Sequence, residues 1–169
     1  MRALVAHVVV VVLAACSERA PAPPVTTTAT HTQGPVGDVL AAYEGARAKL
    51  AADDFAGTLP FASALAAAAR VAAEHAVTAK GSFDGISAGA DRMVAAKDIA
   101  ERRLAFGDVS QRVVALLLAD PELRSGRHLM VCPMAKGYQK WVQTSDRLNN
   151  PYWGKEMLEC GEELKAWSI

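Results

Sequence analysis

Apolar residues recur at steps of three and four through most of residues 36–120, and this spacing constrains the fold more than any other feature. Such residues fall on one face of an α-helix. Asp53 and Asp54 indicate a break with a helix cap, and residues 80–85 have the composition of a turn. The third pattern ends before Pro121, because a residue that precedes proline is disfavoured in the helical region. The apolar positions are Val36, Leu40, Tyr43, Ala46 and Leu50; Phe55, Leu59, Ala62, Ala66, Ala69 and Ala73; and Ile86, Met93, Ile99, Phe106, Val109, Val113 and Leu117.

These patterns predict an all-α domain, an antiparallel three-helix bundle whose third helix runs from about residue 86 to residue 120. Gly107 is a weak point in that helix. Residues 101–103 are interpreted as a helix face with local charge pairing. From about residue 122 we predict an irregular cap rich in sulfur and aromatic residues. Its one extended run, at residues 127–131, would place His128, Met130 and Cys132 on the same side.

The first fifteen residues predict a signal peptide. Arg2 precedes an apolar run over residues 3–15. A helix of that length measures about 20 Å, which is short of the ~30 Å core of a bilayer. The run ends in small residues before Cys16, which resembles a lipoprotein box, so we expect Cys16 to carry diacylglycerol and palmitate-like chains. Ser17 favours the outer membrane, with the protein facing the periplasm. The alternative is an ordinary secretory signal with Cys16 as an incidental thiol.

Residues 16–36 are rich in Pro, Thr and Ala. They can bury too little apolar surface to offset chain entropy, so they predict a lipid-anchored, disordered tether. The remaining residues, 37–169, are enough for one compact domain. The sequence has a formal net charge of zero. It contains no basic stripe, so we expect no nucleic acid as a partner. We expect the membrane as a partner through the lipid anchor.

Sulfur is concentrated in the last forty residues. Cys132 and Cys160 are the cysteines that remain if Cys16 carries the lipid, and Met134 and Met157 lie close to them in sequence. Thiolates and thioethers are the ligands that soft ions such as Cu(I) prefer. Two cysteines are also what one disulfide needs in an oxidising compartment.

Several motifs occur here in the order and approximate spacing of one known family. They are Cys132-Pro133-Met134-Ala135, Trp141 with Gln143, Asn150-Pro151-Tyr152, Gly154, Met157-Leu158 and Cys160-Gly161, preceded by Arg103, Phe106 and Ser110 in the third predicted helix. From about residue 36 to residue 163 the chain resembles the bacterial domain of unknown function catalogued as three-three-four-seven. That family is found in envelope lipoproteins and fused to copper/silver efflux adaptor proteins. The resemblance implies soft-metal handling in the envelope, with efflux components as partners, and no particular reaction.

Three interpretations of the cysteines stay open. In the first, Cys132, Met134, Met157 and Cys160 bind Cu(I) or Ag(I), with His128 and Met130 as additional ligands. In the second, Cys132 and Cys160 form a disulfide that closes a loop of about 28 residues and stabilises the fold by roughly 3 kcal/mol. In the third, one cysteine is a redox or nucleophilic thiol. A bridge that opens on reduction to bind copper would combine the first two.

We expect no catalysis, because the sequence has no Ser-His-Asp spacing, paired acidic motif, phosphate loop or Cys-x-x-Cys pair. The prediction is an outer-membrane lipoprotein that faces the periplasm and binds a soft metal ion for buffering or delivery to efflux. The alternative is a structural or interaction lipoprotein without metal, whose cap is held by a Cys132–Cys160 disulfide. Its aromatic side chains would then meet a protein partner: Tyr138, Trp141, Tyr152 and Trp153.

Overall fold

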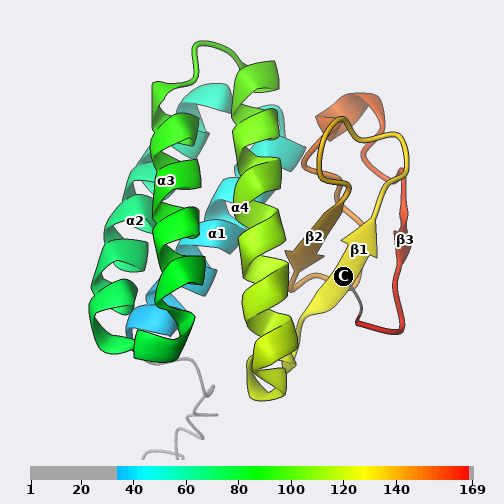
Figure 1. Ribbon diagram of the computed structural model, residues 1–169. Helices are drawn as coiled ribbons and strands as arrows, with labels where there is room; N and C mark the ends of the chain where they lie inside the picture. The colour runs from blue at the N-terminus through cyan, green and yellow to red at the C-terminus, as the bar shows by residue number, and fades with distance from the viewer. Residues whose placement is uncertain (1–33, 168–169) are drawn as a thin grey trace, which may run out of the picture.

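A computed structural model gives the fold of residues 34–167. Helices α2, α3 and α4 lie side by side, and a small sheet lies on the other side of α4 (Figure 1). The predicted signal peptide, Cys16 and nearly all of the predicted tether lie outside the described residues. The elements are α1 (Pro35–Ala51), α2 (Phe55–His75), η1 (Val77–Ala79), α3 (Lys80–Ala95), α4 (Ile99–Ala119), η2 (Pro121–Arg124), β1 (His128–Val131), β2 (Lys140–Gln143), η3 (Gly154–Glu156) and β3 (Glu162–Glu163).

The break at Asp53 and Asp54 is confirmed. Asp53 lies in the left-handed region at φ 59°, where a non-glycine residue is uncommon. The carboxylate of Asp54 accepts a hydrogen bond of 2.8 Å from Gly57 N and so caps α2. The chain can therefore turn sharply between α1 and α2.

The predicted turn at residues 80–85 is wrong, because these residues form the first turns of α3. The chain turns earlier, at Ala76 and η1. The predicted third helix is also wrong, since it is two helices that separate before Asp98. Asp98 has extended backbone, and its side chain accepts a hydrogen bond of 2.8 Å from Glu101 N. Glu101 accepts one in return from Lys97 N at 2.9 Å, which completes a cap around the start of α4.

Most of the predicted apolar positions lie in the core, as the helical spacing requires. Leu59 is an exception and is 42% exposed. Among the described residues, α2 is long and apolar enough by composition to cross a membrane, and a helix packed within a protein core meets the same criterion. Gly107 does not interrupt α4, which continues past it to Ala119.

The cap is less irregular than predicted, because it contains an antiparallel sheet with the strand order β2-β1-β3. The predicted extended run is confirmed as β1. Met130 of β1 pairs with Trp141 of β2 on one side and with Glu163 of β3 on the other. The fold is therefore mainly helical with a small sheet, and not purely α.

A buried hydrogen-bonded cluster joins the sheet to the bundle. The hydroxyl group of Tyr43 in α1 lies 2.8 Å from Ser110 Oγ in α4 and accepts a hydrogen bond of 3.1 Å from Val142 N in β2. Phe106 stacks on the Tyr43 ring at 5.1 Å between centroids, and Tyr152 lies against Phe106 at 6.0 Å. Burial raises the pKa of Tyr43 well above its ordinary value, so its hydroxyl stays protonated.

Two arginines that the sequence placed on a charge-paired helix face have structural roles instead. Arg102 is buried, and its guanidinium group lies 3.8 Å from the centre of the Phe55 ring. It donates hydrogen bonds to the backbone oxygens of Met93 and Phe55, which secures the end of α3 against the start of α2. Arg103 extends from α4 toward the cap, where Pro151 O accepts a hydrogen bond from its Nε at 2.9 Å.

We predict that Tyr43→Phe destabilises the protein by about 1–3 kcal/mol, because Val142 N and Ser110 Oγ would lose a buried partner. Denaturant unfolding of the full chain measures the change. Tyr138→Phe is the matched control, since the Tyr138 hydroxyl has no hydrogen-bond partner among residues 34–167. Equal losses in the two variants would contradict the role assigned to Tyr43.

Candidate functional site

Two tight turns bring Cys132 and Cys160 together at one end of the sheet, where β1 ends and β3 begins. The first turn follows β1 and is closed by a hydrogen bond of 3.0 Å from Ala135 N to Cys132 O. The second is closed by one of 3.0 Å from Cys160 N to Met157 O. The two Sγ atoms lie 2.9 Å apart, and both cysteines are free thiols. Each turn therefore carries one cysteine and one of the predicted methionine ligands.

Asn150 holds the second turn in place. Its side chain is fully buried, and its Nδ2 donates a hydrogen bond of 2.8 Å to Cys160 O. Its Oδ1 accepts from the backbone nitrogens of Tyr152 and Trp153, and its own N donates to Leu158 O at 2.8 Å. One amide side chain thus fixes both ends of the segment that leads back to Cys160.

Gly161 allows the second turn to lie against the sheet. Its φ is +129°, a conformation that residues with a side chain rarely adopt. A Cβ atom there would lie 2.5 Å from Val131 O and 3.2 Å from the Trp141 ring. Only glycine therefore fits directly after Cys160 without moving the turn.

Trp141 and Gln143 organise the loop that follows β2. Trp141 Nε1 donates a hydrogen bond of 3.0 Å to Gln143 Oε1, and both side chains are fully buried. Gln143 Nε2 donates to the backbone oxygens of Ser145 and Arg147, at 2.7 and 2.8 Å. The polar atoms of this pair are hydrogen-bonded within the protein, so neither side chain is free to bind a ligand.

Arg103 and Asp53 join the other end of the cap to the bundle. Arg103 Nη2 donates hydrogen bonds to Leu50 O at 3.0 Å and to Asp53 Oδ1. Asp53 Oδ2 accepts one of 2.9 Å from Lys155 N. Burial raises the pKa of Asp53, but the hydrogen bonds from Lys155 and Arg103 outweigh it and hold that pKa below 3.8. A Cβ atom at Gly154 would lie 2.0 Å from Asp53 Oδ1, so glycine is required there too.

Sequence reasoning missed this link, although a signal for it was present. Arg103, Phe106 and Ser110 are spaced by three and four residues, so they share one face of α4. Each contacts the cap directly or through Tyr43. The pattern noted in the sequence is therefore the surface of α4 on which the cap packs.

The predicted metal ligands differ in how accessible they are. Cys132 is fully buried, whereas Cys160 and Met157 are partly exposed and Met134 is 57% exposed. Met134, Met157 and Cys160 are therefore accessible from solvent, whereas Cys132 is reached only through the turn. These four residues are consistent with a sulfur site at the protein surface.

The two additional predicted ligands are engaged elsewhere. Met130 is only 2% exposed and belongs to the core. His128 Nδ1 lies 2.8 Å from Glu163 Oε1, and its Nε2 lies 3.0 Å from Asp146 Oδ1. Within residues 34–167, no three His, Cys, Asp or Glu side chains are arranged to hold a metal ion. A metal site in this part of the chain would depend on the cysteines together with methionine sulfur.

The aromatic residues predicted as an interaction surface lie mostly inside the protein. Trp141 is fully buried and Tyr152 is 8% exposed, with their ring centroids 5.7 Å apart. Tyr138 and Trp153 are partly exposed. Trp141 and Tyr152 can therefore support a surface from beneath, whereas direct contact with a partner would fall to the other two.

Comparisons with protein-family models, curated proteins and solved structures found no match to this chain. The family resemblance drawn from the sequence motifs therefore stays a prediction.

We predict that Cys160 in the reduced protein is alkylated more slowly than a cysteine in the unfolded chain. The neighbouring Cys132 thiol and burial raise the pKa of Cys160 above its ordinary 9.0, so less of the reactive thiolate is present near neutral pH. Cys132→Ala should speed the reaction several-fold. Mass spectrometry after timed iodoacetamide treatment measures the rate, with the denatured chain as reference. An unchanged rate in Cys132→Ala would contradict the coupling of the two thiols.

We also predict that Asp53 contributes stability above about pH 4 and loses it in acid. A carboxylate whose pKa is lowered by folding stabilises above its unfolded pKa, and this contribution disappears as the pH falls through the folded value. The difference in unfolding free energy between the natural chain and Asp53→Asn should therefore shrink below about pH 4. Asp91→Asn, which removes an exposed pair with Arg70, is the control. A difference that is constant with pH would refute the assignment.

Proposed function

We propose that this protein is an envelope lipoprotein, facing the periplasm from the outer membrane, whose cap binds a soft metal ion such as Cu(I) or Ag(I). It would buffer the ion or deliver it to an efflux system by exchange between sulfur ligands, without catalysis. The observation that carries the proposal is the meeting of the Cys132 turn and the Cys160 turn, each with a methionine in it. The lipid anchor at Cys16 and the efflux components as partners belong to the same proposal.

The other motif residues of the cap have structural roles, and this supports the proposal that the sulfur residues carry the function. Trp141, Gln143 and Asn150 are buried and spend their polar atoms on the local backbone or on each other. Gly154 and Gly161 occupy places where a side chain would collide. Met134 is exposed and Met157 is partly exposed. Function is therefore best sought in the sulfur residues that this scaffold brings to the surface.

The donor set fits a soft ion after a small movement. Thiolate–metal bonds of about 2.3 Å at a tetrahedral angle place two sulfur atoms roughly 3.8 Å apart. The observed separation is 2.9 Å, so the thiols must move apart by about 1 Å to share an ion. Cys160 lies in a partly exposed turn beside the short, exposed strand β3, which leaves room for that movement. Binding would displace the thiol protons, and the thioethers would complete the coordination.

The test is an anaerobic titration of the reduced full chain with Cu(I) against a competing chelator. We expect one tightly bound ion per chain. Met134→Leu together with Met157→Leu should weaken binding at least about tenfold, because two soft donors are lost. Met130→Leu is the matched control, since that methionine is buried in the core and the substitution conserves volume.

Two results would count against the proposal. If the double methionine variant binds as tightly as the natural chain, thioether ligation is wrong. If the reduced protein takes up no Cu(I), the metal-binding function is wrong altogether.

A second candidate is a structural or interaction lipoprotein whose cap is held by a Cys132–Cys160 disulfide. The observation that favours it is the same 2.9 Å separation, which is shorter than a shared ion requires and about 0.9 Å longer than the S–S bond of a disulfide. A thiol count and an intact-mass measurement on protein from the periplasm distinguish the two. A bridge that resists reductant, with no metal uptake, would favour the structural role.

A further inference from the structure

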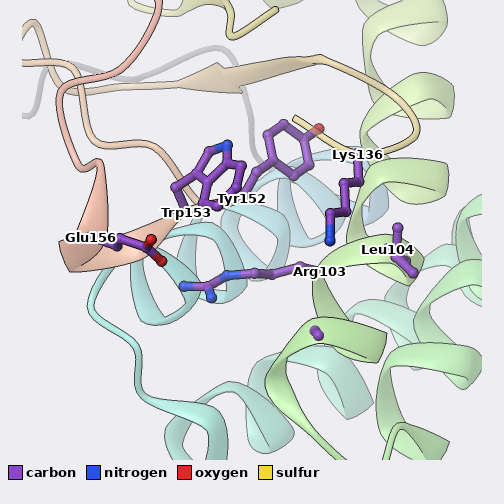
Figure 2. A pocket seen from close by; sticks show the side chains of 7 residues that line it. Arg103, Leu104, Lys136, Tyr152, Trp153 and Glu156 are labelled. Atoms are coloured by element: carbon purple, nitrogen blue, oxygen red, sulfur yellow. The ribbon is translucent and has the colours of Figure 1, made fainter. Parts of the chain in front are cut away.

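A cavity of about 230 Å³ lies between α4, the loop that joins β1 to β2, and the segment that contains η3. Figure 2 shows its lining side chains from close by. An engineered apolar cavity of about 150 Å³ is enough to hold benzene, so this volume suits a molecule of about ten non-hydrogen atoms. The lining residues are Ala100, Arg103, Leu104, Lys136, Tyr152, Trp153 and Glu156.

The walls of the cavity are fixed before any ligand binds. Arg103 is held by hydrogen bonds to Pro151 O and Leu50 O and by its ion pair with Asp53. The Tyr152 hydroxyl donates to Lys140 O at 2.6 Å. A preformed pocket costs little ordering on binding, which favours affinity for a small ligand.

One wall is apolar and exposed. Leu104 is 51% exposed on α4, and the β1–β2 loop passes close to it, since a Cβ atom at Gly137 would lie 3.8 Å from Leu104 Cδ2. The Trp153 and Tyr152 rings lie above the Arg103 side chain in Figure 2. A flat or branched apolar group placed between Leu104 and these rings would have both of its faces shielded from water.

Arg103 and Lys136 are the cations in the cavity lining, and Glu156 is its carboxylate. Asp53 balances the charge of Arg103, yet Arg103 Nη1 has no hydrogen-bond partner among the described residues. In Figure 2, Lys136 extends from its loop toward the aliphatic part of the Arg103 side chain, away from the guanidinium group, and it has no ion-pair partner in residues 34–167. Glu156 lies across the cavity from Lys136, on the side of the Arg103 guanidinium group, and would repel a second negative charge on a ligand.

We propose that this pocket binds a small monocarboxylate with an apolar or aromatic body. Lys136 holds the carboxylate, and the body lies against Leu104 and the Trp153 ring. Glu156 selects against dicarboxylates. The site is separate from the sulfur turns and does not depend on metal binding.

The test is a titration of the metal-free, reduced full chain with phenylacetate, in which two-dimensional NMR spectra are recorded at each step. We expect saturable shifts confined to the pocket, including the Trp153 side chain, with a dissociation constant on the order of 1 mM. Phenylacetamide, which has the same shape without the charge, should bind at least about tenfold more weakly. Phenylmalonate, with a second carboxylate, should also bind more weakly.

Three substitutions assign the roles. Lys136→Gln should weaken phenylacetate binding about tenfold or more, because a charge-assisted hydrogen bond is lost. Lys97→Gln, at an exposed lysine that does not line the pocket, should leave binding unchanged. Glu156→Gln should narrow the preference for phenylacetate over phenylmalonate.

The proposal is overturned if no saturable shift occurs up to about 20 mM phenylacetate. It is also overturned if phenylacetamide binds as tightly as phenylacetate, or if Lys136→Gln binds like the natural chain. Shifts that map away from the pocket lining would have the same consequence.

Discussion

The buried hydroxyl group of Tyr43 is the interaction on which the rest of the structure depends. It joins α1, α4 and β2 through Ser110 Oγ and Val142 N, in a region from which water is excluded. A sheet of three short strands has little stability alone, and here it is held by packing on α4. Without that attachment the two cysteine turns, which extend from the strand ends, would have no fixed relation to each other.

The helices could be predicted from the sequence because their apolar positions repeat with the helical period. Their number could not be obtained from periodicity alone, since the apolar pattern continues across Asp98. The Asp98 and Glu101 cap that separates α3 from α4 is a local signal that outweighs that pattern. The glycines in residues 80–85 caused the opposite error, because they predict a turn where the chain is helical. Gly89 shows why helical glycines occur here: a Cβ atom there would lie 2.6 Å from Val109 Cγ2, so its absence lets α3 approach α4.

The sulfur residues could be found from the sequence, whereas their mutual geometry could not. Cys132 and Cys160 meet because Asn150 and Gly161 shape the second turn, and these contacts span the fold. Sequence spacing likewise gave no sign that His128 is held between two carboxylates or that Met130 belongs to the core. The pocket beside α4 was not predicted, because its lining comes from three separate segments of the chain. The cap thus brings the two cysteines together at one end of the sheet.

Copper K-edge X-ray absorption of the Cu(I)-loaded, reduced protein tests the central claim most directly. Two cysteine thiolates with methionine thioethers predict a first shell of sulfur alone, with bonds near about 2.3 Å. A shell of nitrogen or oxygen atoms would contradict the account, because it would locate the ion away from the Cys132 and Cys160 turns.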